Sequence, residues 1–131
     1  MKDSEVRGRL VEKHLGSLEA QVMRVLWGTP NLTVRDVAKR LSGHRQRAYT
    51  TVMTVMNRLC EKGLLDRVPK GRAYTYSPRM SEGALLDDIT RRTVSKLISD
   101  FGDVAVAGFV GEVRNRGPDE LEKLRKLLEE A

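Results

Sequence analysis

The residues best suited to chemistry in this 131-residue chain are threonines and arginines between positions 45 and 58. On a helical wheel with Val52 at zero, Arg47, Thr50 and Thr54 lie opposite the apolar side chains. One face can therefore pack while the other contacts a ligand. Threonine offers a hydroxyl and a methyl group, and arginine offers paired N–H donors, which are groups that read base edges in the major groove of DNA.

We expect Arg47, Thr50 and Thr54 to read bases, because they occupy the N-terminal half of the outward face, where the groove is within reach. Phosphate contacts position a protein on DNA without reading its sequence. For these contacts we expect Arg45, Thr51, Arg58, Lys70 and Arg72.

Positive charge is concentrated in the N-terminal part of the chain. The net charge is +6, and residues 1–78 hold 15 Lys and Arg against 7 Asp and Glu, whereas residues 79–131 hold 9 against 11. Such clustering is typical of a surface that binds nucleic acid. On charge alone, a basic surface that only keeps the protein soluble explains the pattern equally well.

Three helices and two strands are predicted to position these residues. Helical spacing and strand alternation predict helices at 17–27, 33–41 and 48–62 and strands at 64–68 and 72–77. Ser17 is the expected N-cap of the first helix, Thr33 and Asp36 form an approximate capping box on the second, and Gly63 ends the third. A tight turn is expected at residues 69–71. This order predicts a winged helix, whose third helix enters the major groove.

Beyond Pro78 the sequence predicts only amphipathic helices, at 81–99, 104–113 and from Pro118 onward. Their apolar faces have no sheet or bundle of their own, so we expect them to pair with a second copy of the chain. The expected dimer contacts are Leu85, Leu86, Ile89, Leu97, Ile98, Phe109, Val110, Leu121, Leu124 and Leu128.

The predicted fold class is mainly α with a small β-hairpin. We expect an N-terminal tail at residues 1–14, a winged helix-turn-helix DNA-binding domain at 15–78 and a helical dimerisation domain at 79–131. No apolar run approaches the roughly 18 residues that span a bilayer, and residues 1–14 do not resemble a signal peptide. We therefore expect a cytoplasmic protein without membrane insertion.

Chemistry other than binding is not expected from this sequence. It contains no nucleophile–base pair, no phosphate-binding glycine loop and no cluster of metal ligands, so we predict neither an enzyme nor a cofactor or metal site. Cys60, the single cysteine, is interpreted as a packing residue. Tyr49 could stack on DNA, but its place on the wheel favours packing.

Several runs of the sequence resemble one known family. They are AYTTVMTVMNRL (48–59), EKGLL (61–65), KGRAY (70–74) and YSP (76–78), with LEAQVM (18–23), LW (26–27) and TVRDV (33–37) upstream. Together they look like the penicillinase and methicillin-resistance repressors of the BlaI/MecI/CopY type. The resemblance implies a winged-helix repressor that binds a palindromic operator as a homodimer. It also implies a membrane-bound sensor protease as a partner that triggers cleavage of the C-terminal domain.

Two features of this chain differ from particular members of that family. Staphylococcal-type members are cut at an Asn-Phe bond, and no Asn-Phe dipeptide occurs here. The copper-responsive branch carries a C-terminal cysteine cluster, whereas this chain has only Cys60. We therefore predict a sequence-specific, homodimeric transcriptional repressor, relieved by a signal acting on its C-terminal region. The alternative is a winged-helix protein-interaction module without sequence-specific DNA binding.

Overall fold

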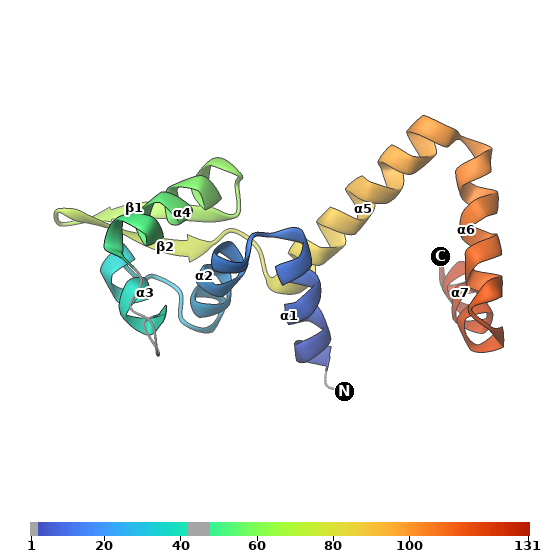
Figure 1. Cartoon of the computed structure of the whole chain (residues 1–131), viewed down its shortest axis with the longest axis horizontal. Helices are drawn as coiled ribbons and strands as arrows, with labels where there is room; N and C mark the ends of the chain where they lie inside the picture. The colour runs from blue at the N-terminus through green and yellow to red at the C-terminus, as the bar shows by residue number, and fades with distance from the viewer. Residues whose placement is uncertain (1–2, 42–47) are drawn as a thin grey trace. The chain divides into compact units, whose positions relative to one another are not determined.

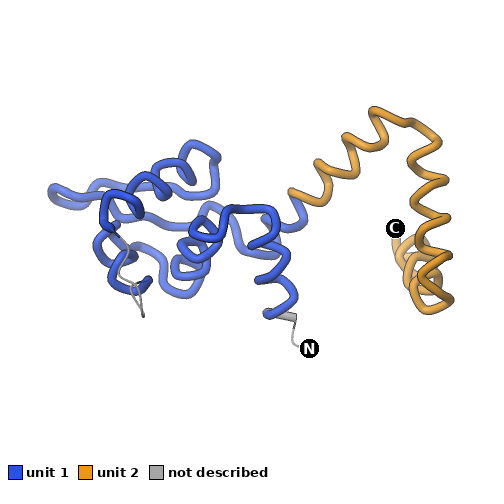
Figure 2. The backbone as a smooth tube through the Cα atoms, in the orientation of Figure 1, with its two compact units in different colours: residues 1–88 blue, residues 89–131 orange. Residues whose placement is uncertain are grey.

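The computed structural model of the chain describes residues 3–41 and 48–131 (Figure 1). Its elements, in chain order, are α1 (Asp3–His14), α2 (Ser17–Gly28), α3 (Val34–Leu41), α4 (Tyr49–Glu61), β1 (Leu65–Lys70), β2 (Ala73–Pro78), α5 (Glu82–Phe101), α6 (Asp103–Asn115) and α7 (Pro118–Glu130). They fall into two compact units, residues 1–88 and 89–131, which Figure 2 shows in different colours.

Unit 1 is built around α2, α3 and α4, with the hairpin β1–β2 running beside α4 (Figure 1). Each helix turns an apolar stripe inward because its apolar residues recur every three or four positions. The buried residues of these elements include Val22, Met23, Leu26, Val34, Val37, Val52, Val55, Met56, Leu59, Leu65 and Tyr76. Three helices followed by a hairpin make a winged helix-turn-helix, which confirms the predicted fold.

The end of α4 depends on Gly63, as the sequence predicts. Gly63 has φ +79°, which is in the left-handed region that favours glycine. The N–H groups of Gly63 and Leu64 donate to the carbonyls of Cys60 and Leu59 at 3.0 and 2.9 Å. This pair of bonds is the Schellman arrangement, which stops a helix and turns the chain toward β1.

The hairpin turn lies one residue later than the sequence predicted. The strands pair antiparallel from Leu65 opposite Pro78 to Lys70 opposite Ala73, so the turn is Gly71 and Arg72. Gly71 has φ +63°, and glycine in the first position is typical of a type II′ turn. Pro69, expected in the turn, lies in β1. A proline is tolerated there because β1 is the edge of a two-stranded sheet.

The N-terminal segment is more ordered than a tail. Most of residues 1–14 form α1, which contacts α2, and Val11 of α1 is fully buried. The pattern gave little sign of this helix, because Val11 is one of few apolar residues in it. A second correction concerns the next helix, where Gly16 occupies the N-cap and Ser17 is the first helical residue.

Unit 2 lacks a core of its own. It contains the C-terminal part of α5 together with α6 and α7, of which α6 and α7 contact each other. No residue from 89 to 131 is buried, although many of them are apolar. By contrast Leu85, in the first turn of α5, is 1% exposed and belongs to unit 1. We therefore correct the assignment of Leu85 as a dimer contact, because a side chain buried within one copy is not available to contact another copy.

Candidate nucleic-acid interface

The outward face of α4 carries the polar residues that the sequence selected. Thr50, Thr51, Thr54 and Arg58 are all exposed. On the other side of α4, Val52, Val55, Met56 and Leu59 are buried. The helix therefore presents a continuous polar surface, while its packing face fixes its orientation in unit 1. Arg45 and Arg47 lie outside the described residues.

The hydroxyl of Thr54 is already engaged within α4. It donates a hydrogen bond to the carbonyl oxygen of Thr50 at 2.9 Å. Threonine commonly forms this bond inside helices. The proton of Thr54 is thus used internally, which leaves its methyl group and the oxygen lone pairs for an incoming ligand.

The hairpin adds a second cationic element. Lys70 and Arg72 flank Gly71 at the tip of the wing, and all three are exposed. Neither cation has a carboxylate partner among the described residues. They differ in this from Lys62 and Arg79, which pair with Glu19 and Asp66 at 2.8 and 2.7 Å. Unpaired cations at a wing tip can contact phosphates without first breaking an ion pair.

A groove of about 480 Å³ lies between α4, the start of α3 and β2. It is lined by Thr33, Val34, Arg35, Tyr49, Met53, Arg72, Ala73, Tyr74 and Tyr76. Tyr49 is 49% exposed and Tyr74 43% exposed, so the packing role predicted for Tyr49 is wrong. The wheel placed Tyr49 near the buried stripe, but it is the first residue of α4, where neighbouring helices no longer cover it. Arg35, Tyr49 and Tyr74 are interface candidates that the sequence did not select.

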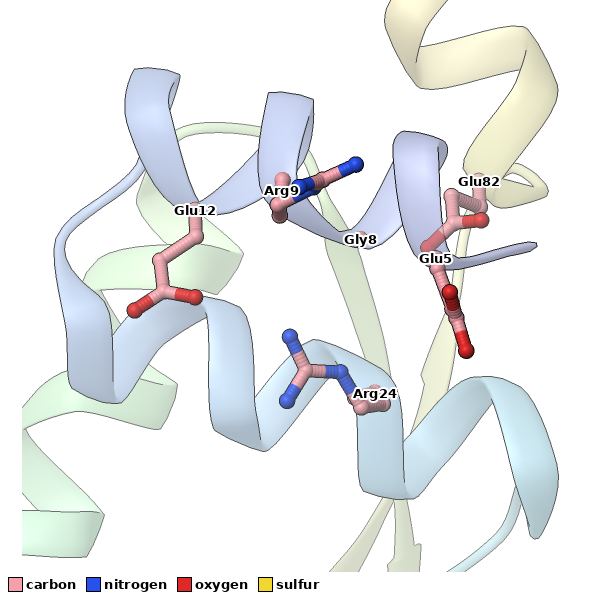
Figure 3. Close-up of a pocket in the computed structure, with 6 residues that line it drawn as sticks. All are labelled: Glu5, Gly8, Arg9, Glu12, Arg24 and Glu82. Carbon is pink, nitrogen blue, oxygen red and sulfur yellow. The ribbon is translucent and has the colours of Figure 1, made fainter. Parts of the chain in front are cut away.

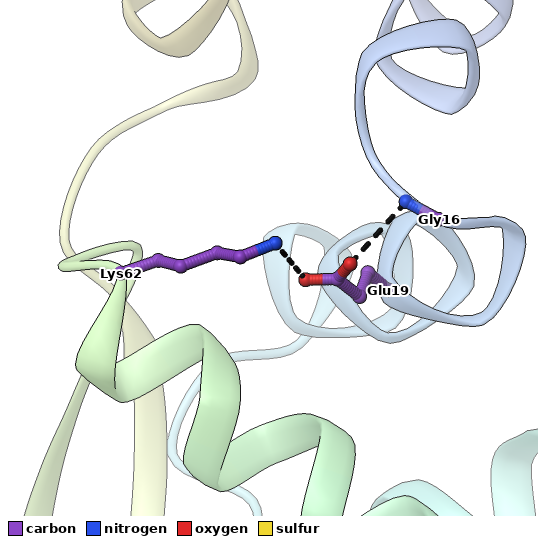
Figure 4. Close-up of polar contacts among 3 residues, drawn as sticks. All are labelled: Gly16, Glu19 and Lys62. Carbon is purple, nitrogen blue, oxygen red and sulfur yellow. Dashed lines mark hydrogen bonds and ion pairs between the residues drawn. The ribbon is translucent and has the colours of Figure 1, made fainter.

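Polar contacts fix α4 and the hairpin to the rest of unit 1. Lys62, after the last turn of α4, reaches Glu19 at the start of α2, and Glu19 also accepts the Gly16 N–H at 3.3 Å (Figure 4). Trp27 donates its indole N–H to the carbonyl of Met80 at 2.9 Å. Both contacts lie near the base of the hairpin, where β1 begins and β2 ends.

Two titratable groups near the interface have shifted pKa values. The backbone N–H of Thr33, followed by its side-chain hydroxyl, lowers the pKa of Asp36 through the predicted capping box. Burial raises the pKa of the Cys60 thiol, which keeps it protonated and weakly nucleophilic at neutral pH. The Cys60 shift supports a packing role for this residue.

A second hollow, of about 630 Å³, is lined mostly by charged residues and includes none from α4. Glu5, Gly8, Arg9 and Glu12 of α1 line it together with Arg24 of α2 and Glu82 of α5 (Figure 3). The guanidinium of Arg24 points toward α1 in that view. Its mixed charges do not match one class of ligand. Among residues 3–41 and 48–131 no group of three or more His, Cys, Asp or Glu side chains could hold a metal ion.

No helix in the described part of the chain has both the length and the apolar character needed to cross a membrane.

Comparisons with known proteins agree with this geometry. Residues 15–130 match the family model described as Penicillinase repressor. The transcriptional regulator BlaI of Mycobacterium tuberculosis is 38% identical over 117 residues, which is 88% of this chain and 83% of that protein. The penicillinase repressor of Bacillus licheniformis is 25% identical over 116 residues, or 88% of this chain and 90% of that protein.

One solved structure extends the comparison to the fold. The transcriptional regulator Tm0710 of Thermotoga maritima aligns with 96% of this chain and 86% of its own, at 20% identity and a TM-score of 0.51. At that identity the likeness concerns the fold alone.

Proposed function

The chain belongs to the penicillinase repressor family, a family of transcriptional repressors and not of enzymes, and from that premise we propose that it represses transcription by binding an operator in double-stranded DNA. The observation that carries the proposal is the exposed Thr50, Thr51, Thr54 and Arg58 surface of α4 beside a wing tip with two unpaired cations. Polar side chains on the helix can read bases, while the wing cations hold phosphates. The protein acts in the cytoplasm.

We propose further that the repressor is a homodimer on a palindromic operator. Unit 2 supports this because it exposes large apolar side chains, among them Leu97, Ile98, Phe101 and Phe109, and buries none. A second copy of the same unit would cover them, and two-fold symmetry in the protein then requires two-fold symmetry in the operator. The predicted contacts other than Leu85 stay in this proposal.

Relief of repression is assigned to unit 2, with a membrane-bound sensor protease as the proposed partner. α5 ends at Phe101 and α6 begins at Asp103, with Gly102 at φ +58° between them. Helices on both sides resist a protease, so cleavage here requires local unfolding. Incubation with membranes from β-lactam-treated cells of the source organism, followed by mass spectrometry, tests this. Cleavage outside unit 2, or none, would contradict it.

Selection of duplexes from a random pool tests the central proposal without knowledge of the operator. We expect enrichment of one two-fold symmetric sequence, bound by two protomers, with an affinity that falls steeply as salt increases. A scrambled duplex of the same composition is the control. Failure to enrich any sequence would contradict the repressor and favour the alternative, in which the outward face of α4 docks a protein.

A further inference from the structure

We propose that the groove between α3, α4 and β2 holds a stretch of the sugar–phosphate backbone of one operator strand. Arg35 and Arg72 contact its phosphates, and the rings of Tyr49 and Tyr74 flank its sugars. This inference rests on the proposed function, and it adds Arg35, Tyr49 and Tyr74 as positioning residues for DNA.

The charge of the groove favours an anionic ligand such as a phosphate. Arg35 and Arg72 are exposed, and neither has a carboxylate partner among the described residues. None of the described residues that line the groove is acidic. A concave surface with one sign of charge concentrates ligands of the opposite sign. The hollow beside α1 provides a contrast, because Glu5, Glu12 and Glu82 surround its arginines.

The apolar part of the groove favours a ligand that has apolar groups beside its phosphate. Val34 and Tyr76 are buried, while Met53, Tyr49 and Tyr74 are partly exposed around them. A bare phosphate would leave these surfaces unused. A nucleic-acid backbone alternates an anionic phosphate with a sugar that has apolar C–H groups, so it complements both the guanidinium groups and the rings.

The two tyrosines also offer hydrogen-bond donors. Within the described part of the chain, neither the Tyr49 nor the Tyr74 hydroxyl has a hydrogen-bond partner. Tyrosine hydroxyls are common donors to phosphate oxygens. The guanidinium carbon of Arg67 lies 4.5 Å from the centroid of the Tyr74 ring, a cation–π contact that restricts the ring before DNA binds.

The position of the groove agrees with this use. It joins the first residues of α4, whose outward face is proposed to read bases, to the wing at Arg72. A helix inserted in the major groove has a phosphate strand on each side of it. Residues that lie between the helix and the wing are therefore where one of those strands must pass.

The test compares Arg35→Gln with Arg24→Gln, a matched change of an exposed arginine on α2. With the full-length protein and the selected duplex, we expect Arg35→Gln to lower the slope of log affinity against log salt by about one per protomer. The operator-to-scrambled affinity ratio should not change, because phosphates carry no sequence information. Arg24→Gln should match the wild type, and Arg35→Lys should restore the slope.

Two further measurements locate the contact. Ethylation of individual phosphates should interfere with wild-type binding at one position in each half-site, where Arg35→Gln becomes insensitive. Tyr49→Phe removes only a hydroxyl, so we expect affinity to fall by about three- to tenfold with an unchanged salt slope. Thermal melts of each variant report folding separately.

The possible failures can be told apart. If no duplex binds the wild type, the proposed function itself fails, and this inference fails with it. If the duplex binds and Arg35→Gln equals Arg24→Gln, only the groove assignment is overturned. A changed operator-to-scrambled ratio at constant slope would make Arg35 a base-reading residue instead. Tighter binding of free thymidine monophosphate than of duplex, lost in Arg35→Gln, would make the groove a small-molecule site.

Discussion

At the residue scale, one hydrogen bond of Thr54 limits which of its groups can contact DNA. Its hydroxyl donates to the Thr50 carbonyl, so the group most available to DNA is the methyl. A threonine methyl recognises thymine by apolar contact with the C5-methyl group of that base. We therefore expect Thr54→Val to keep the preference for one operator base and Thr54→Ser to lose about 1 kcal/mol of discrimination there. Titration against duplexes with single substitutions measures this.

Thr51 provides the control for Thr54. It is exposed on the same helix and proposed to contact phosphate. We expect Thr51→Val to weaken operator and variant duplexes by the same factor. If Thr54→Ser retains the base preference and Thr54→Val loses it, the hydroxyl and not the methyl reads the base.

Residues whose role depends on sequence neighbours could be predicted, and those that depend on distant ones could not. The capping box of Thr33 and Asp36 spans one helical turn, so the pattern contained all of it. The exposure of Tyr49 depends on which elements cover the start of α4, and the groove beside it combines side chains from Thr33 to Tyr76. No local periodicity encodes that combination.

At the scale of helices and strands, substitutions at the ends of elements should change the free energy of unfolding measurably. Gly63 is the clearest case. An added Cβ at Gly63 would be strained by φ +79° and would lie 3.1 Å from Nη1 of Arg79. We expect Gly63→Ala to lower the free energy of unfolding by about 1–2 kcal/mol. Gly83 lies within α5 with open space around it, so Gly83→Ala should raise it by about 0.5–1 kcal/mol. Urea denaturation of both variants measures the contrast.

Gly71→Ala distinguishes the two causes of the expected loss at Gly63, which are backbone strain and steric contact with Arg79. Gly71 has φ +63° but no atom near the added Cβ. If steric contact with Arg79 contributes, Gly71→Ala destabilises the protein less than Gly63→Ala does. Equal losses would assign the whole effect to backbone strain.

Glu19, which is 8% exposed, forms an ion pair between α2 and the residue that follows α4. Its carboxylate both caps α2 through Gly16 and pairs with Lys62. We expect Glu19→Ala to lower the free energy of unfolding by about 2 kcal/mol, since it removes both interactions. Lys62→Met keeps the cap and the apolar stem, so it should cost about 1 kcal/mol or less. Equal losses in urea denaturation would show that the cap contributes nothing.

At the scale of the whole molecule, charge predicted a division into a basic part and a helical part. The division by contacts falls after Asp88, within α5. The sequence predicts it after Pro78, because only amphipathic helices are expected beyond that residue. Periodicity cannot show that the first turn of α5 belongs to unit 1, where Leu85 is buried, because it reports spacing along one helix and not burial in the fold.

The exposed apolar faces of unit 2 give the last prediction. Phe109 is 57% exposed, and a carboxylate in its place would be desolvated in any interface that covers it. We expect Phe109→Glu to convert a dimer into a monomer in sedimentation equilibrium. Affinity for the full operator should fall by about 10²-fold or more, because the second half-site no longer binds intramolecularly. Affinity for an isolated half-site should not change, since α4 and the wing belong to unit 1.

Asn115→Glu, an exposed polar position in α6, is the matched control. A dimer that survives both Phe109→Glu and Leu97→Glu would place the interface elsewhere and remove the reason for a symmetric operator.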